Sequence, residues 1–166
     1  MFKQKLSPVV VEYQFVNMSS EYADEIAYKW KYSGKYSFYN LSKDKEDMQA
    51  FLKPESWNNI FAVIDADSQA LMGFSTYIFE NKMMWLGVGM KPSYTGKGYG
   101  ERFVRAAIQF GLEHYGYEEN KILLSVAKFN KRAIALYEKV GFRPIESKEL
   151  LVNGKLYPFL IMGIAI

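Results

Sequence analysis

The sequence predicts a single mixed α/β domain over residues 1–166, with a central, mostly antiparallel sheet of about seven strands flanked by about four helices. Three observations lead to this fold class. The length of 166 residues suits one compact domain. Hydrophobic residues make up 49% of the chain, which is enough for a sizeable core. Short β-branched and aromatic runs alternate with segments in which apolar residues recur at helical spacing.

The part of the chain before its glycine-rich loop predicts four strands and two helices. Tyr13 and Phe15 alternate with polar residues, as in a half-buried strand. Ser19 and Ser20 offer an N-cap ahead of acidic residues, and Pro54 ends a later apolar stripe. We expect strands over residues 9–16, 60–64, 71–79 and 83–90, with helices from Ser20 to near Gly34 and over 43–53.

The remaining chain predicts two helices, a strand between them and a closing hairpin. Gly141 is a good stop for the second of these helices. Asn153-Gly154 is the strongest hairpin signal in the chain. We expect helices over residues 100–115 and 130–140, and strands over 122–127, 144–152 and 156–164.

Composition excludes several classes of function. The chain has no cysteine and a single histidine, His114, so disulfides, thiolate chemistry and a metal site of Cys or His ligands are not expected. A net charge of +3, without a basic cluster, argues against a nucleic-acid partner. No stretch has the length of a membrane span, and no signal peptide is apparent, so we expect a cytoplasmic protein without a membrane partner.

The segment from Met90 to Gly100 carries the strongest functional signal. Gly96, Gly98 and Gly100 follow a predicted strand and open a predicted helix. Glycine lets the backbone turn sharply so that N–H groups converge, and a helix N-terminus adds unpaired donors and partial positive charge. The segment therefore predicts a site for a phosphate or diphosphate.

Two familiar phosphate loops do not match this segment. A Walker-type loop needs Ser or Thr after Gly-Lys, whereas Gly98 follows Lys97 here. A dinucleotide loop needs a glycine where Glu101 stands. On spacing alone, a glycine-rich turn without a ligand is an equally good interpretation.

A second constellation lies in the next predicted helix. Asn130, Ala133 and Tyr137 are spaced three and four residues apart, so they share one helical face. An amide, a small side chain and a phenol are unusual for a purely buried stripe. By itself, however, this pattern also fits an amphipathic core tyrosine with its hydroxyl at the rim.

Together, the two segments resemble the cofactor motifs of the GNAT superfamily of N-acetyltransferases. Gly98 and Gly100 fit the first motif, although Thr95 stands where the family usually has Gln or Arg. The second motif has Asn, a small residue, Leu-Tyr and then Gly-Phe, and residues 130–142 fit it closely. The order of elements from residue 9 to 164 also fits, so the resemblance covers nearly the whole chain and implies the GNAT fold.

The resemblance implies direct transfer of an acetyl group from acetyl-CoA to a primary amine, with the coenzyme as the only cofactor. Lys97 could supply the charge that Thr95 lacks. The resemblance also admits a homodimer. It implies that the coenzyme is bound by the end of the central strand, the glycine loop and the following helix, at Val88, Gly89, Met90, Thr95, Gly96, Lys97, Gly98, Tyr99, Gly100, Asn130, Ala133 and Tyr137.

For catalysis, the resemblance points to Tyr137 as the general acid that protonates the leaving thiolate. Many relatives carry a basic carboxylate on the central strand, but residues 83–90 contain none. Glu80, just before that strand, and a relay through water are equally good candidates for the base.

The acceptor pocket of the family is formed largely by the first two helices and the last hairpin. Trp30, Tyr32, Tyr36 and Tyr39 are the expected acceptor-binding residues, either as an aromatic wall or as a cation–π cradle. A small-molecule or peptide amine fits this pocket, and a packed lid over the sheet is the structural alternative. Three rival functions stay open: a coenzyme-binding module without catalysis, a nucleotide-binding protein, and a transferase for longer acyl groups.

Overall fold

The computed structural model describes residues 10–166 and contains a seven-stranded sheet in the order β1-β2-β3-β4-β5-β7-β6. Every pair of neighbouring strands is antiparallel except β4 and β5, which run parallel. The predicted mixed, mostly antiparallel sheet is therefore confirmed. The strands are β1 (Tyr13–Asn17), β2 (Ile60–Asp65), β3 (Leu71–Glu80), β4 (Met83–Met90), β5 (Lys121–Ala127), β6 (Arg143–Val152) and β7 (Lys155–Ala165).

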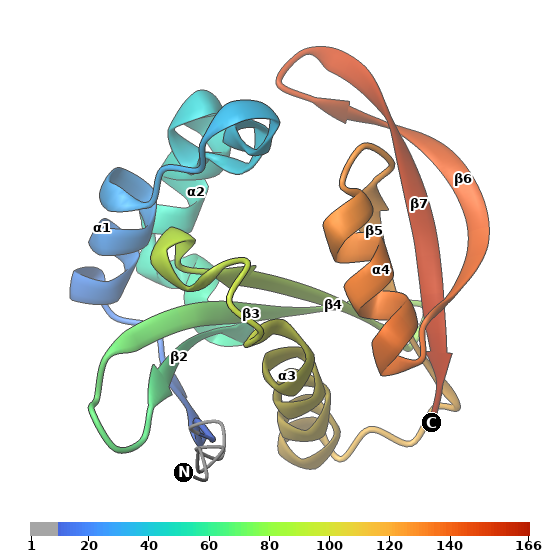
Figure 1. Ribbon diagram of the computed structural model, residues 1–166, viewed down its shortest axis with the longest axis horizontal. Coiled ribbons are helices and arrows are strands. Elements are labelled where there is room, and N and C mark those ends of the chain that lie inside the picture. Colours follow the sequence, from blue (N-terminus) through green and yellow to red (C-terminus); the bar gives the residue numbers. More distant parts are fainter. Residues whose placement is uncertain (1–9) are drawn as a thin grey trace, which may run out of the picture.

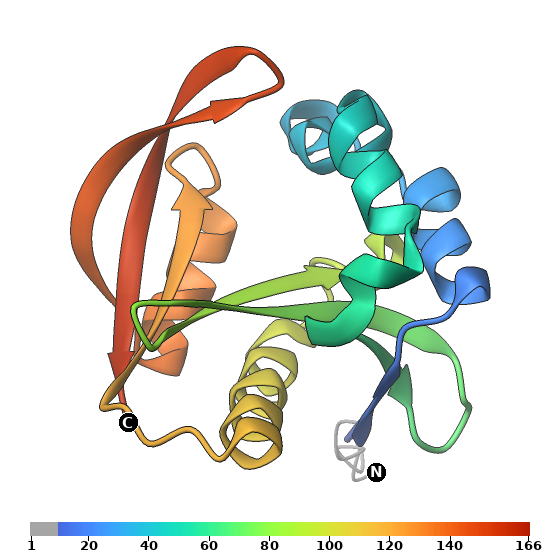
Figure 2. The ribbon, with the colours of Figure 1, turned by 180° about the vertical axis from the view of Figure 1, so that it is seen from behind.

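Four α-helices cover the sheet within the described part of the chain. In Figure 1, α1 and α2 lie on one side of strands β2 to β4, α3 lies on the other side, and α4 lies beside α3 against β5. Figure 2 shows the same arrangement from behind. The helices are α1 (Ser20–Lys29), α2 (Lys45–Leu52), α3 (Gly100–Tyr115) and α4 (Lys131–Val140), with short 3-10 helices η1 (Gly34–Tyr39), η2 (Leu41–Lys43), η3 (Pro54–Asn59) and η4 (Pro92–Tyr94).

Strand β2 is buried on both faces and separates two apolar cores. Phe61 and Val63 belong to the core beneath α3, whereas Ala62 and Ile64 belong to the core beneath α1. This division follows from the strand geometry, because successive side chains point to opposite faces. On the α3 side, the fully buried Tyr77 donates its phenol hydrogen to the main-chain oxygen of Ala107 at 2.6 Å, which ties α3 to the sheet.

The predicted elements occur in the predicted order, and the largest difference is at the end of the first helix. Helix α1 ends at Lys29 instead of continuing to about Gly34. The main-chain N–H of Tyr32 donates to the Asn40 side chain at 2.7 Å, and Gly34 has a φ of 59°, so this stretch leaves the helical path and enters η1. The first strand begins at Tyr13, and residue 9 of the expected strand lies outside the described residues.

Strands β4 and β5 are paired only at their beginnings. Met84 lies opposite Ile122 and Trp85 lies opposite Leu123, and beyond these two pairs the strands diverge. Figures 1 and 2 show β5 rising steeply away from β4. The divergence leaves the end of β4 without a hydrogen-bonded neighbour on that side, next to the N-termini of α3 and α4.

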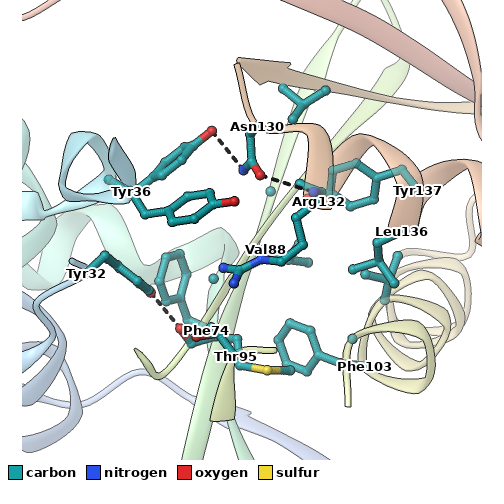
Figure 3. A pocket seen from close by; sticks show the side chains of 18 of the residues that line it. Tyr32, Tyr36, Phe74, Val88, Thr95, Phe103, Asn130, Arg132, Leu136 and Tyr137 are labelled. Atoms are coloured by element: carbon teal, nitrogen blue, oxygen red, sulfur yellow. Dashed lines mark hydrogen bonds between the residues drawn. The ribbon is translucent and has the colours of Figure 1, made fainter. Parts of the chain in front are cut away.

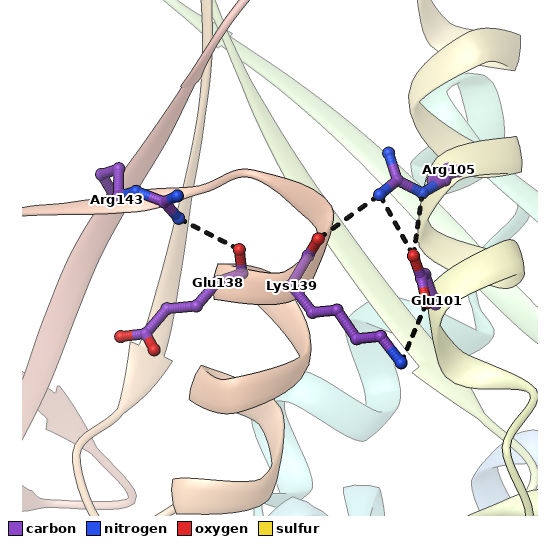
Figure 4. A network of polar contacts seen from close by, with 5 residues as sticks. All are labelled: Glu101, Arg105, Glu138, Lys139 and Arg143. Atoms are coloured by element: carbon purple, nitrogen blue, oxygen red, sulfur yellow. Dashed lines mark hydrogen bonds and ion pairs between the residues drawn. The ribbon is translucent and has the colours of Figure 1, made fainter.

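A small polar network joins α3 to α4 (Figure 4). The Glu101 carboxylate accepts from Arg105 at 3.1 Å and lies 3.2 Å from the Lys139 ammonium. Arg105 also donates to the main-chain oxygen of Lys139 at 3.3 Å. These contacts hold the first turn of α3 against the last turn of α4.

Replacing Glu101 by glutamine should make thermal stability less dependent on acid pH. Hydrogen bonds from Arg105 and Lys139 lower the pKa of Glu101 below its ordinary value of 4.5, so its contribution is present above that value and is lost as the pH falls further. At pH 7 we expect Glu101→Gln to lower the melting temperature by about 1–2 °C, the scale of an exposed ion pair. The difference should shrink and then vanish as the pH falls through the lowered pKa of Glu101. Glu138→Gln is the control, and an equal effect of that change would contradict the assignment.

Candidate active site

A cavity of about 560 Å³ occupies the space where β4 and β5 part. Its walls are the ends of these two strands, the glycine-rich loop, the first half of α4, and the aromatic segment from the end of α1 through η1 (Figure 3). The rest of the lining comes from η2 (Leu41), α2 (Phe51), β3 (Phe74 and Thr76), α3 (Phe103 and Val104) and β7 (Phe159). The cavity thus brings together segments that are far apart in the sequence.

The β4 wall exposes its main chain because its glycines cannot carry side chains. A Cβ atom on Gly89 would overlap the ring of Phe74, and one on Gly87 would overlap the hydroxyl of Thr76, both from the neighbouring strand β3. Packing against β3 therefore requires glycine at these positions. Val88 and Met90 line the cavity as well, so the strand residues expected from the sequence lie at the cavity.

The loop after β4 presents unpaired main-chain donors. Gly96 and Gly98 have φ angles of 72° and 87°, a left-handed conformation that favours glycine. Within the described residues, the N–H groups of residues 96–99 have no main-chain or side-chain acceptor. The first turn of the sixteen-residue helix α3 follows at once. The loop and helix N-terminus therefore form an electropositive cradle for an anion.

The six expected loop residues divide into two groups. Thr95, Gly96, Gly98 and Gly100 line the cavity, whereas Lys97 and Tyr99 do not. The Thr95 hydroxyl donates to the main-chain oxygen of Pro92 at 2.8 Å and so closes the turn of η4. The threonine that replaces the family's usual Gln or Arg thus has a local structural contact.

Helix α4 presents the expected stripe to the cavity. Asn130 is its N-cap: its Oδ1 accepts from the N–H of Ala133 at 3.1 Å, and its Nδ2 donates to the Tyr39 hydroxyl at 3.1 Å. Ala133 and Tyr137 follow on the same face and line the cavity. The half-buried phenol of Tyr137 has a pKa raised above its ordinary value of 10, first because burial disfavours the phenolate and second because Tyr39 lies nearby. Tyr137 therefore stays protonated and can donate a hydrogen.

Arg132 was not among the residues expected from the sequence. Its guanidinium lies 4.4 Å from the ring centroid of Tyr36, a cation–π contact, and Figure 3 shows it reaching from α4 across the cavity. A Cβ atom on Gly96 would lie 3.7 Å from its Nη1, so the charge sits beside the glycine loop. A cation in the first turn of a helix near a glycine-rich loop is the sequence signal for this residue, but Arg132 lies off the helical face that Asn130, Ala133 and Tyr137 share.

The four expected acceptor residues all line the cavity, and each has a defined partner. Trp30 is 3% exposed and donates from its indole nitrogen to Glu25 at 2.8 Å. The Tyr32 hydroxyl donates to the main-chain oxygen of Met90 at 2.6 Å, and burial raises its pKa to about 12. Tyr36 lies beneath Arg132, and Tyr39 accepts from Asn130. These residues form a continuous aromatic wall opposite α4.

Glu80 lies outside the cavity, contrary to its expected role as a base. It is exposed at the turn between β3 and β4, where it pairs with Met83, while Phe74 and Gly89 of the same hairpin lie at the cavity end. Six residues of extended chain separate Glu80 from Phe74, which is about 20 Å. Sequence proximity to the central strand was misleading here, because the antiparallel hairpin places Glu80 at the opposite end of that strand.

Two other classes of site find no support in residues 10–166. This part of the chain has no group of three or more His, Cys, Asp or Glu side chains arranged to bind a metal ion. None of its helices combines the length and apolar character that crossing a membrane requires.

The protein is thus a mixed α/β domain in which a glycine-rich loop lies beside a parallel pair of strands that part. The chain belongs to the acetyltransferase (GNAT) family, whose model matches residues 22–142. The motif resemblance and the GNAT fold expected from the sequence are therefore confirmed.

Solved structures with the same fold cover nearly the whole chain. A GNAT-family acetyltransferase from Bacillus anthracis superposes with a TM-score of 0.73 at 18% identity, covering 95% of this chain and 97% of that one. A chimera of the Vibrio cholerae spermidine N-acetyltransferase SpeG with hSSAT gives a TM-score of 0.68 at 20% identity, covering 92% and 95%. The V. cholerae spermidine/spermine N-acetyltransferase SpeG with manganese gives 0.67 at 20%, covering 92% of each chain. No curated protein sequence matches this chain.

Proposed function

We propose that this protein is an acetyl-CoA-dependent N-acetyltransferase that moves an acetyl group to a primary amine by direct attack. The observation that carries the proposal is the row of unpaired N–H groups at residues 96–99, beside a strand end that exposes its main chain and a protonated phenol on α4. The N–H groups would bind the diphosphate of coenzyme A, and the exposed main chain would pair with its pantetheine arm. The phenol would face its thiol. Membership of the acetyltransferase family supports the same assignment.

The residues that line the cavity follow the order of the chemical groups along coenzyme A, from the diphosphate to the thiol. The N–H groups of the glycine loop and the start of α3 would hold the diphosphate, with Arg132 as a charged partner. The bare main chain of Gly87 to Met90 would pair with the pantetheine arm, and Asn130 and Ala133 would border it. Acetyl-CoA supplies the acetyl group as a thioester, which is the activated form that an amine can attack.

Tyr137 is the group best suited to protonate the leaving thiolate. Its raised pKa keeps the hydrogen on the phenol at neutral pH, so it is in the donor form. In the described part of the chain no carboxylate lines the cavity. An ordinary alkylamine has a pKa near ~10.4 and must lose a proton before attack. We therefore assign proton removal to water in the cavity, the other candidate expected from the sequence, rather than to Glu80.

The acceptor is an amine, and spermidine is the first one to test, because several structural neighbours carry the name spermidine N-acetyltransferase. A CoA-release assay with acetyl-CoA and a panel of amines tests the proposed reaction. In parallel, acetyl-CoA but not ATP should raise the melting temperature, as a ligand selective for the folded state does. Stabilisation by ATP alone would contradict the cofactor assignment.

One observation favours a second candidate, a coenzyme-binding protein without catalysis. Among residues 10–166, no carboxylate that could act as a base lines the cavity. Tight binding of acetyl-CoA without transfer to any amine of the panel would identify this alternative and would refute the proposed enzyme.

Arg132→Gln should weaken acetyl-CoA binding by about five- to tenfold at low salt, the scale of one charge-assisted contact to phosphate. Because the Arg132 side chain is partly open to solvent, added salt should reduce the difference between variant and wild type. Isothermal titration at two salt concentrations measures both effects. Arg143→Gln, at the far end of α4, is the matched control, and equal weakening by both changes would contradict the role of Arg132.

A further inference from the structure

The cavity contains an unusual combination of charge and surface chemistry on its acceptor side. The acceptor half, formed by α1, η1, η2, α2 and β3, is lined by large aromatic or aliphatic side chains. These are Ile26, Trp30, Tyr32, Tyr36, Tyr39, Leu41, Phe51 and Phe74. Of all the residues that line the cavity within the described chain, Arg132 alone carries a formal charge, and it is positive.

Two of the three phenol hydroxyls of this wall are already engaged. The Tyr32 hydroxyl donates to Met90, and the Tyr39 hydroxyl accepts from Asn130. The ring of Tyr36 is covered by the Arg132 guanidinium. These contacts leave the Tyr36 hydroxyl as the free polar group of the wall and give the wall no negative charge that could face an incoming ammonium group.

The carboxylate behind this wall is also engaged. Glu25 of α1 accepts from the Trp30 indole at 2.8 Å and lies 3.5 Å from the Lys91 ammonium. It does not line the cavity. An acceptor with several ammonium groups would therefore enter an apolar space without a counter-charge, and burying an unpaired charge is strongly unfavourable.

Contacts across the cavity hold the aromatic wall in place. Phe38 of η1 packs edge-on against Phe129 at 5.3 Å and against Tyr157 at 4.9 Å between ring centroids. These partners come from the segment before α4 and from β7, on the opposite side of the cavity from α1. The wall is thus supported from both sides, and its apolar surface belongs to the packed structure.

We infer that the acceptor is a monoamine with an apolar, ring-sized body, and not a polyamine. This inference rests on the proposed acetyl transfer and narrows its substrate class. A single amine can enter uncharged after losing its proton to water, while its body is buried against the aromatic wall. Each further ammonium group would have to be desolvated against an apolar wall that offers it no carboxylate. The inferred monoamine therefore differs from spermidine, the amine that several structural neighbours have in their names.

Acetylation of 2-phenylethylamine and spermidine, measured by CoA release, compares the two classes directly. We expect kcat/KM to favour 2-phenylethylamine by at least about tenfold, equivalent to ~1.4 kcal/mol. Equal use of the two amines, or a preference for spermidine, would overturn the inference while leaving the proposed transferase intact.

A pair of variants that differ only in charge tests the physical cause. Leu41, half-buried on η2, lines the acceptor half. Relative to Leu41→Gln, Leu41→Glu should improve kcat/KM for spermidine by about tenfold, because it supplies the missing counter-charge. Ser125→Asp and Ser125→Asn repeat the comparison at an exposed position of β5 that also lines the cavity, in case Leu41→Glu does not fold. No difference between either folded pair would contradict the charge argument.

A binding measurement separates this inference from the proposed reaction. With CoA present, 2-phenylethylamine should raise the melting temperature more than spermidine does at the same concentration. If no amine is acetylated but this order holds, the proposed catalysis fails and the acceptor class stands. If spermidine stabilises the protein equally or more, the acceptor class fails whatever the activity.

Discussion

Tyr137→Phe should lower kcat by about 10²–10⁴-fold, the usual contribution of a placed proton donor, while the Kd for acetyl-CoA changes by less than about twofold. The ring that packs against Phe142 is retained, with centroids 5.9 Å apart, so only the hydroxyl is lost. A CoA-release assay measures kcat, and isothermal titration measures the Kd for acetyl-CoA. An unchanged kcat would show that the thiolate leaves without a proton from this phenol.

The pH dependence of the wild-type enzyme provides a second check on Tyr137. A phenol donates only below its pKa, and burial moves the pKa of Tyr137 above 10. The proton needed by the leaving group is therefore available throughout the neutral and mildly alkaline range. We expect kcat to show no decline from loss of this proton between pH 7 and about 9.5. A decline in that range that disappears in Tyr137→Phe would contradict the raised pKa.

Tyr77→Phe is the matched control, because it also removes one tyrosine hydroxyl but at a different place. The Tyr77 hydroxyl donates to Ala107 in the core beneath α3 and does not line the cavity. Its loss should lower the free energy of unfolding by about 1 kcal/mol and leave kcat within about twofold. The two variants should therefore show opposite patterns, with one losing turnover and the other losing stability.

Gly98→Val should raise the Kd for acetyl-CoA by about ten- to a hundredfold, since a side chain at a strained backbone position costs about 1–3 kcal/mol. Gly98 has a φ of 87°, which β-branched residues avoid. Nothing lies within 4 Å of an added Cβ atom at this position, so the effect comes from the backbone conformation and not from a clash. A loop that relaxes toward negative φ no longer holds the N–H groups of residues 96–99 in the arrangement that we propose for binding the diphosphate.

Gly116→Val separates the loss of the anion cradle from a general loss of stability. Gly116 has a φ of 56° and equally open surroundings, but it caps the C-terminal end of α3. Both changes should lower the melting temperature, but only Gly98→Val should weaken the binding of acetyl-CoA. If the two variants bind acetyl-CoA equally well, the glycine loop does not hold the diphosphate.

Local chemistry explains why much of the fold and half of the site could be predicted. Asn153-Gly154 sets its own hairpin through left-handed φ angles of 49° and 78°. Asn130, Ala133 and Tyr137 share a face through helical spacing alone, and Gly96 and Gly98 permit the loop whatever surrounds them. Element boundaries were less predictable: α1 ends early because Tyr32 pairs with Asn40, a contact that helical periodicity does not encode.

The placement of Glu80 and Arg132 shows where local reasoning stops. Glu80 is near the central strand in sequence, but the antiparallel hairpin places it at the turn, about 13 Å along β3 from Thr76, the nearest lining residue of that strand. Arg132 is one of many surface cations in the sequence, and only the approach of α4 to the glycine loop gives it a role. In both cases the deciding quantity is a distance between elements.

The class of fold, the glycine-rich loop and the helical stripe with Tyr137 could be predicted from the amino-acid sequence, because each depends on the conformational preferences of neighbouring residues. Three features became visible only in the folded protein: β4 and β5 part after two residue pairs, Phe74 requires a glycine at position 89, and no carboxylate of residues 10–166 lines the acceptor half. These features depend on which distant segments pack together, and that packing is set by the burial of two cores across one sheet.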